Sequence, residues 1–331
     1  MNPIPEAVDR RAGGDRDGEN VPEAVDRRAG DDRDGENVPE AVDRRAGGDR
    51  DGENVPEAVD RRAGDDRDAK KGRVLIMAGS DSGGGAGIQA DIKAVTLLGG
   101  FAATAITAIT IQNTLGVHGV HPVPLEVIEA QAKVVLDDIG ADALKTGMLG
   151  SVEVVETVAG LIDYAAGIPA VVDPVMIAKG GSPLLAETAV EAVRRLMVPR
   201  AFLLTPNAPE AEALTGLEVA DLDGQRRAGE ALLKMGAQAV LMKGGHVPGE
   251  MVIDLLLTGD GETVLESERV VSRHTHGTGC TLASACAAGI AKGLPLPVAV
   301  AEGWAYVAEA IRRAPGLGQG HGPLDHAWPV R

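Results

Sequence analysis

From Arg73 onward, short runs of apolar residues alternate with longer segments in which apolar residues recur at helical spacing. A continuous apolar run is typical of a strand buried on both faces of a parallel sheet, and a 3.6-residue spacing is typical of an amphipathic helix. The runs that predict strands are 73–78, 101–111, 143–149 (ending in a turn), 170–173, 202–205 and 239–243. The segments that predict helices are 88–95, 124–139, 152–162, 186–197, 211–214, 224–235, 281–292 and 297–312.

The order of these elements predicts an α/β fold for residues 73–331. Strands joined by helices through right-handed crossovers give a mainly parallel central sheet with helices on both faces, a three-layer sandwich. Two further runs, 254–257 and 263–265, predict a short antiparallel pair, and 269–271 is strand-like. The length of this part suits one domain or at most two small ones.

The first 72 residues are of a different kind. Residues 1–72 repeat the sequence Glu-Ala-Val-Asp-Arg-Arg-Ala-Gly, which begins at Glu6, Glu23, Glu40 and Glu57, 17 residues apart. The copies contain no aromatic residue and only isolated valines and alanines, too little apolar surface to offset the entropy of ordering. We expect a disordered acidic tail; a translated tandem repeat upstream of the true start is the alternative. The segment lacks the apolar stretch of a signal peptide.

Charge and cysteine content narrow the functional classes. The formal net charge of −17 argues against a nucleic-acid-binding surface, and we see no apolar run that predicts a membrane span. The two cysteines, Cys280 and Cys286, are too few for a structural zinc site and lie too close together on one helix for a disulfide. We therefore expect a protein of the reducing cytoplasm, without nucleic-acid or membrane partners.

Polar or glycine-rich positions follow the predicted strands. Because ligands bind beyond the carboxyl ends of parallel strands, these positions are expected to converge on one site. They are Gly79, Gln112, Met148, Asp173, Asn207 with Glu210, Lys243 and the turn at Gly277.

The segment from His274 to Thr281 is the strongest local signal. Gly277, Thr278 and Gly279 form a turn that opens a helix rich in small residues, so free backbone N–H groups and the positive end of the helix dipole can hold a phosphate. The same helix start is expected to lower the pKa of Cys280, which makes this thiol a candidate base. The alternative is a buried helix start in which the cysteine only fills space.

Three charged residues suit the nucleotide side of a phosphate site. Asp173 and Glu210 are hard oxygen ligands that suit Mg²⁺ bound mostly through water and phosphates. Lys243, followed by two glycines, suits a phosphate contact. The alternatives are a helix or turn cap for Asp173, a first-turn carboxylate favoured by the helix dipole for Glu210, and a solvated lysine for Lys243.

Other residues suit an aromatic ligand. Gln112 can donate and accept hydrogen bonds in one plane, as the edge of a heteroaromatic ring requires, and Met148 and Val175 could form apolar walls. Strand-end packing is the alternative for each. The glycine loop 79–87 fits neither the dinucleotide fingerprint nor the Walker loop, and His246, His274 and His276 are expected to shape loops rather than bind metal. The set as a whole describes phosphoryl transfer.

These motifs resemble the hydroxymethylpyrimidine and phosphomethylpyrimidine kinases of thiamine biosynthesis, within the ribokinase-like superfamily. The resemblance runs from about Val74 to about Trp328 and rests on ordered motifs at 78–81, 85–91, 112–114, 145–149, 173–176, 205–211, 243–246 and 276–281. It implies ATP, Mg²⁺, two successive phosphorylations and a homodimer.

The resemblance also implies individual roles. Gln112 would lie on the pyrimidine edge, Met148 and Val175 beside the ring, and Glu210 near Mg²⁺. Many superfamily members carry aspartate where this chain has Cys280. A pyridoxal kinase of the same fold is the nearest rival; a non-catalytic vitamin-binding protein and a tail-driven interaction module are the others.

Overall fold

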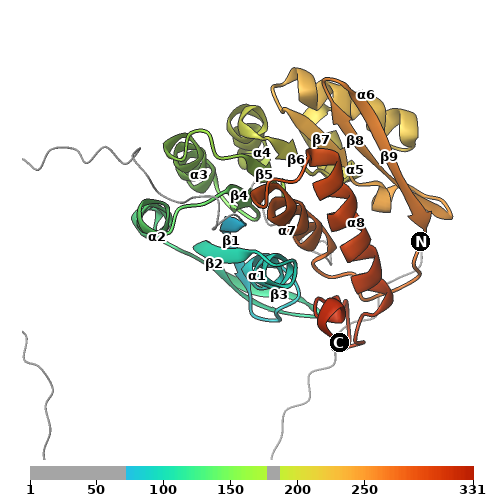
Figure 1. Ribbon diagram of the computed structural model, residues 1–331, viewed down its shortest axis with the longest axis horizontal. Coiled ribbons are helices and arrows are strands. Elements are labelled where there is room, and N and C mark those ends of the chain that lie inside the picture. Colours follow the sequence, from blue (N-terminus) through green and yellow to red (C-terminus); the bar gives the residue numbers. More distant parts are fainter. Residues whose placement is uncertain (1–71, 177–186) are drawn as a thin grey trace, which may run out of the picture. The chain divides into compact units, whose positions relative to one another are not determined.

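The computed structural model describes residues 72–176 and 187–331 (Figure 1). The repeat predicted to be a disordered tail, up to residue 71, lies outside these residues, as does the first residue of the helix predicted over 186–197.

A nine-stranded sheet runs through the folded part in the order β3-β2-β1-β4-β5-β6-β7-β8-β9. Neighbouring strands from β2 to β7 are parallel, and antiparallel pairs complete both edges. The strands are β1 (Arg73–Asp81), β2 (Phe101–Asn113), β3 (Gly116–Pro122), β4 (Ala143–Thr146), β5 (Ala170–Val172), β6 (Leu203–Leu204), β7 (Ala239–Met242), β8 (Met251–Thr258) and β9 (Gly261–Glu268). The predicted mainly parallel sheet is confirmed.

Helices cover both faces of this sheet, as Figure 1 shows. The α-helices are α1 (Gly87–Leu97), α2 (Leu125–Asp138), α3 (Val152–Tyr164), α4 (Glu187–Ala192), α5 (Ala208–Thr215), α6 (Leu222–Lys234), α7 (Thr278–Ala291) and α8 (Leu296–Arg312). Helices α1, α7 and α8 share one buried apolar cluster, and α2 to α6 share the other. The predicted three layers are therefore confirmed.

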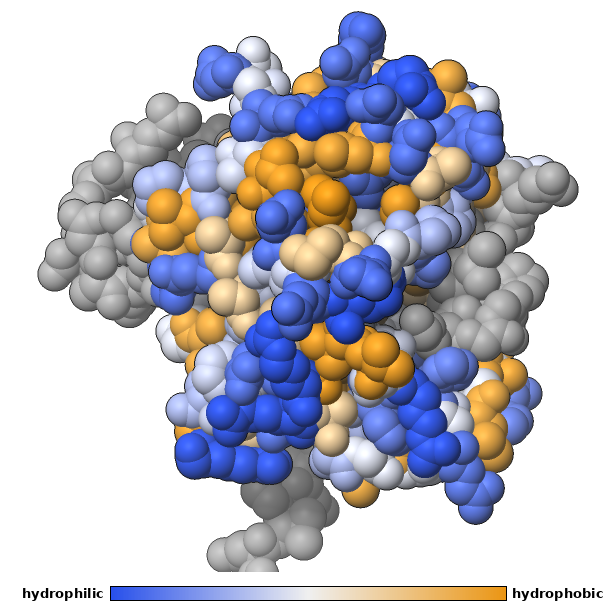
Figure 2. Space-filling model, turned by 90° about the vertical axis from the view of Figure 1, so that its right-hand side faces the viewer, coloured by the Kyte–Doolittle hydropathy of each residue, from blue (hydrophilic) through white to orange (hydrophobic). Residues whose placement is uncertain are grey.

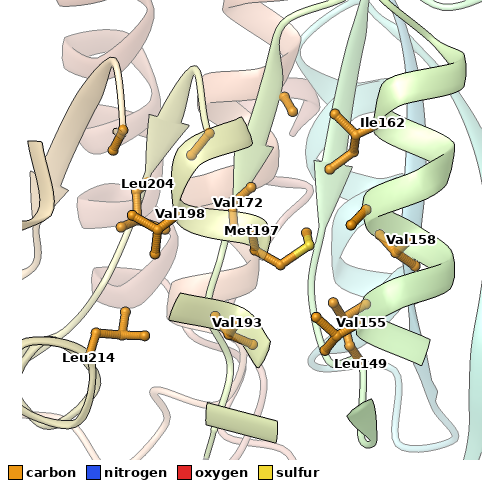
Figure 3. Close-up of a cluster of buried hydrophobic side chains, with 14 of the residues drawn as sticks. Leu149, Val155, Val158, Ile162, Val172, Val193, Met197, Val198, Leu204 and Leu214 are labelled. Carbon is orange, nitrogen blue, oxygen red and sulfur yellow. The ribbon is translucent and has the colours of Figure 1, made fainter. Parts of the chain in front are cut away.

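Strand β1 shows how the sequence produces two cores. Its alternate residues Leu75 and Met77 join the cluster on the α2–α6 face, whereas Val74, Ile76 and Ala78 join the cluster on the α1–α7–α8 face. Side chains alternate between the faces of a strand, so a continuous apolar run fills both cores. On the first face, Val155, Val158 and Ile162 of α3 point toward Met197 (Figure 3).

The sheet edges differ from the predictions. Strand β3 was not predicted, because its residues Gly116–Pro122 lack an apolar pattern and lie half-buried or exposed at the edge. The prediction of a strand at 269–271 is wrong, because β9 ends at Glu268 and Val271 is 98% exposed. The helix predicted over 186–197 continues from α4 into a π-helical turn, Val193–Met197, and a 3₁₀ turn, Val198–Arg200.

The surface is mixed in character. On the side of the molecule that carries β8 and β9 in Figure 1, hydrophobic residues alternate with hydrophilic ones (Figure 2). Among the helices of residues 72–176 and 187–331, none has the length and apolar character needed to cross a bilayer.

Candidate active site

The first turn of α7 packs directly over the carboxyl ends of the central strands. A Cβ added at Gly279 would lie 3.2 Å from Nζ of Lys243 and 3.7 Å from Oδ2 of Asp173. Lys243 follows β7 and Asp173 follows β5. The glycine therefore lets the helix start approach a lysine and a carboxylate that a larger residue would displace.

The same turn also packs against the glycine loop after β1. Gly277 has a φ of +82°, and a Cβ there would lie 1.8 Å from the carbonyl oxygen of Gly85. Thr278 is held by its hydroxyl, which donates to the carbonyl of Thr275 at 2.8 Å. Among the described residues, no carbonyl accepts from the N–H groups of Gly279 or Cys280. These groups and the helix dipole could hold an anion, and this first turn of α7 is called the cradle below.

Lys243 bridges two buried carboxylates below the cradle. Its Nζ lies 2.9 Å from Oδ1 of Asp173 and 3.6 Å from Oε2 of Glu210. Burial and the Asp173 carboxylate raise the pKa of Glu210 to about 7, although Lys243 acts in the opposite direction. Burial lowers the pKa of Lys243, but the two carboxylates outweigh it and raise this pKa above its usual value. The lysine thus remains a cation between two acids.

Asn207 and Glu210 begin α5 as a reciprocal cap. Asn207 Oδ1 accepts the N–H of Glu210 at 2.9 Å, and Glu210 Oε2 accepts the N–H of Asn207 at 2.8 Å. The alternative for Glu210, a carboxylate in the first turn of a helix, is therefore part of the structure, and this carboxylate also caps α5. It uses one carboxylate oxygen and leaves Oε1 available.

The carboxylate pair fits a hard divalent cation held largely by other ligands. In the described part of the chain, no group of three or more His, Cys, Asp or Glu side chains is arranged to hold a metal. Asp173 and Glu210 supply two carboxylates. Burial raises the pKa of Glu210, and repulsion from Asp173 raises it further. One or two carboxylates with water and phosphates are the ligands that Mg²⁺ takes.

The pKa of Cys280 differs from the prediction. Burial, with the carboxylates of Asp91 and Asp173, raises it to about 12, although Lys145 lowers it. The expected lowering is therefore wrong. The helix start cannot offset desolvation and two nearby negative charges, so the thiol is neutral at rest.

A second cluster lies at the start of the same turn. His276 Nε2 lies 2.9 Å from Oδ2 of Asp81 and 3.2 Å from Nε2 of Gln112. Burial raises the pKa of Asp81, but hydrogen bonds from His276, the N–H of Ala86 and Gln112 outweigh it and lower this pKa to about 2. His276 shapes its loop as expected, but it also contacts Gln112, which the sequence analysis missed.

The predicted apolar walls lie at two neighbouring strand ends. Met148 is 9% exposed, and a Cβ at Gly79 would lie 2.4 Å from its Cε, so Gly79 gives this methionine its space. Val175 lines a cavity of about 10 Å³ beside Asp173. Such a volume holds roughly one water and no aromatic ring.

One turn thus links two groups of the predicted site residues. Gly279 contacts the group of Lys243, Asp173 and Glu210, whereas His276 contacts Gln112. Sequence reasoning missed Asp81 and the buried pair of Asp91 with Lys145. All three lie in the quoted motifs, but their burial was not evident from the residues.

Comparison with known proteins identifies the family of this chain. A family model described as "Phosphomethylpyrimidine kinase" matches residues 81–325. A hydroxymethylpyrimidine/phosphomethylpyrimidine kinase of Bacillus subtilis is 48% identical over 255 residues, covering 77% of this chain and 94% of that protein. The Streptomyces coelicolor protein of the same name is 51% identical over 257 residues, with 78% and 95% covered.

Solved structures confirm the predicted ribokinase-like fold. An ADP complex of Bacillus subtilis pyridoxal kinase has a TM-score of 0.73 and 37% identity, covering 78% of this chain and 98% of that one. A phosphomethylpyrimidine kinase of Clostridium difficile has a TM-score of 0.65 and 39% identity, covering 72% and 99%. With this fold, this site and the family match together, the chain belongs to the phosphomethylpyrimidine kinase family.

Proposed function

We propose that this protein transfers the γ-phosphoryl group of ATP to hydroxymethylpyrimidine and then to its monophosphate, giving the pyrimidine diphosphate for thiamine biosynthesis. The observation that carries the proposal is the single turn from His276 to Cys280. It contacts Gln112 at one end and the Lys243–Asp173 pair at the other. Both substrates can therefore meet at its free N–H groups.

The nucleotide would bind on the Lys243 side. Lys243 and Asn207 would contact ATP, and Asp173 and Glu210 would hold Mg²⁺, which supplies positive charge against the phosphates when bound. The N–H groups at Gly277, Gly279 and Cys280 would face the charge that develops during transfer, and Thr278, whose N–H already donates to the carbonyl of Thr275, would hold the turn in place. Positioning and charge stabilisation, rather than covalent chemistry, supply most of the rate acceleration.

The pyrimidine would bind on the Gln112 side. Gln112 would pair with the ring edge, and Gly79, Met148 and Val175 would line the ring once the small cavity beside Val175 widens on binding. Because the Cys280 thiol is neutral, it would first have to give up its own proton to water when ATP and Mg²⁺ bind, and its thiolate would then accept the proton of the hydroxymethyl group in the first reaction. The phosphate nucleophile of the second reaction needs no base, so there Cys280 would only line the site.

We further propose a homodimer in the cytoplasm. Two unpaired cysteines suit a reducing compartment. Exposed apolar side chains gather on the β2–β3 hairpin, where Ile109, Ile111 and Val120 are 49%, 64% and 51% exposed. Light scattering during size-exclusion chromatography measures the mass, and a monomer at micromolar concentration contradicts the dimer.

A pyridoxal kinase is the second candidate, because solved pyridoxal kinases superpose on this chain with a TM-score of 0.73. The test is product analysis with ATP, Mg²⁺ and either free alcohol, resolving pyrimidine monophosphate from diphosphate. We expect both pyrimidine products. A higher kcat/KM for pyridoxal than for hydroxymethylpyrimidine would overturn the proposal.

A further inference from the structure

The amide of Gln112 belongs to a cluster contributed by three separate segments. Asp81 ends β1, Gln112 lies near the end of β2, and His276 precedes the turn at Gly277. Nε2 of His276 contacts both Oδ2 of Asp81, at 2.9 Å, and Nε2 of Gln112, at 3.2 Å. The side chains of Asp81 and His276 are only 2% and 12% exposed. The hydrogens in this cluster must therefore be matched within the protein.

The carboxylate of Asp81 fixes where the protons lie. It accepts the N–H groups of Gly83, Gly85 and Ala86 at 2.8, 3.0 and 2.8 Å, so it is ionised and can only accept. Nε2 of His276 must then carry a proton directed at Asp81. That nitrogen has no lone pair left for a hydrogen bond from Gln112.

This network assigns the orientation of the Gln112 amide. If Oε1 were turned inward, it would face the ionised carboxylate of Asp81. With the NH₂ group turned inward, Nε2 can donate to that carboxylate. Such a hydrogen bond from Gln112 is one of the contacts that lower the pKa of Asp81. Oε1 then points away from the cluster, and we find no donor to it within residues 72–176 and 187–331.

The imidazole itself is held by contacts that do not involve Gln112. The backbone N–H of His276 donates to the carbonyl of Gly322 at 3.1 Å. A Cβ at Gly85 would lie 2.6 Å from Cδ2 of the ring, so the ring packs on a position that only glycine allows. His276 is therefore a rigid support for the amide beside it.

We propose that Asp81 and His276 are positioning residues that hold Oε1 of Gln112 toward the substrate and thereby select alcohols whose ring carries an amino group beside a ring nitrogen. This inference rests on the proposed function and names its specificity determinant. Oε1 accepts from the amino group, and the second hydrogen of Nε2 faces the ring nitrogen. Rejection of an analogue that lacks the amino group follows, because Oε1 then stays unpaired.

The test compares hydroxymethylpyrimidine with an analogue in which hydrogen replaces the amino group. For the unchanged protein, we expect kcat/KM to favour the amino compound by about tenfold or more, as one buried hydrogen bond supplies. For Asp81→Asn and His276→Asn, we expect this ratio to fall to within about threefold of one, with the KM of ATP little changed. A general folding defect lowers kcat/KM for both substrates equally and leaves their ratio unchanged.

His118→Asn is the matched control, because this exposed histidine lies on β3 of the same hairpin and contacts Asn113 rather than the Gln112 side chain. It should keep the full ratio. If Asp81→Asn does not fold, His276→Asn and His276→Gln decide. An unchanged ratio in the folded variants overturns the inference.

Calorimetric binding of the two pyrimidines separates this inference from the proposed function. Suppose that neither pyrimidine is phosphorylated, but the unchanged protein binds the amino compound more tightly and His276→Asn removes this preference. That result contradicts only the kinase assignment. Equal binding of both pyrimidines to the unchanged protein overturns the inference.

Discussion

Nζ of Lys145 lies 2.9 Å from both carboxylate oxygens of Asp91, and neither side chain is exposed to solvent. Ser284 of α7 donates to Oδ1 of the same carboxylate at 2.7 Å. The cluster thereby joins β4, α1 and α7 one helical turn after Cys280. Burial lowers the pKa of Lys145, but Asp91 and other nearby negative groups raise it above its usual value. Burial also raises the pKa of Asp91, against the effect of Lys145, so it is the contact of Nζ with both carboxylate oxygens that indicates an ionic pair inside the core.

Removing one partner of this pair should strongly destabilise the fold. Lys145→Met leaves the Asp91 carboxylate buried without its cation, which costs about 3–5 kcal/mol. Urea unfolding followed by circular dichroism measures the loss. Lys145→Met combined with Asp91→Leu should recover part of it, because no buried charge remains. Lys133→Met is the control, since Lys133 forms an exposed pair with Glu129 and its loss should change little. A small loss for Lys145→Met would contradict an ionic pair.

Two glycines with the same φ angle distinguish the cost of backbone strain from the cost of a steric clash. Gly277 and Gly293 both have a φ of +82°, but a Cβ at Gly293 meets nothing within 4 Å, whereas at Gly277 it lies 1.8 Å from the carbonyl of Gly85. Gly293→Ala should cost about 1–2 kcal/mol for the left-handed conformation alone. Gly277→Ala should cost more and should lower kcat, because the turn must move away from the loop at Gly85. Equal losses of stability and unchanged kcat would show that this approach is unimportant.

The raised pKa of Glu210 predicts how stability depends on pH. The pKa lies at about 7 in the folded chain against 4.5 for an unperturbed glutamate, so folding favours the protonated form. This contribution is fully present below pH 4.5 and is lost as pH rises through 7. Glu210→Gln, which stays neutral and can keep the cap at Asn207, should therefore gain stability relative to the unchanged protein at pH 8 but not at pH 4.5. Equal effects at both pH values would contradict the raised pKa.

The same carboxylate predicts a response to metal. Magnesium chloride should raise the Tm of the unchanged protein at pH 8 more than at pH 5.5, because an ionised Glu210 binds the cation better. Differential scanning fluorimetry without nucleotide measures this shift. In Glu210→Gln the shift should shrink, whereas in Glu262→Gln, which removes an exposed carboxylate paired with Arg226, it should persist. A shift that survives Glu210→Gln would place the metal elsewhere.

The sequence predicts where the strands lie better than it predicts the pKa values of the groups at their ends. Apolar runs such as Val74–Ala78 identify the strands of the core, because a residue buried on either face of the sheet is usually apolar. Edge strand β3 was missed because an edge strand needs no apolar face. The direction of the Cys280 pKa was wrong because it depends on Asp91 and Asp173, which are distant in sequence. Spacing along the chain does not report which charges fold together.

The neutral thiol of Cys280 can be tested by alkylation. With a pKa of about 12, its thiolate fraction is very small at pH 7, so iodoacetamide should react slowly and its rate should keep rising to pH 10 without a plateau. Cys286→Ala isolates the signal, and Cys286 is wholly buried. A plateau in the alkylation rate below pH 8 would show that the pKa of Cys280 is lowered, as the sequence predicts. If the thiol loses its proton once ATP and Mg²⁺ are bound and then acts as a general base, Cys280→Ala should slow phosphorylation of the alcohol by about 10²-fold but should spare the monophosphate, whose nucleophile is already ionised. Equal slowing of both reactions, measured as kcat for each purified substrate, would mean that the sulfur shapes the cradle instead of accepting a proton.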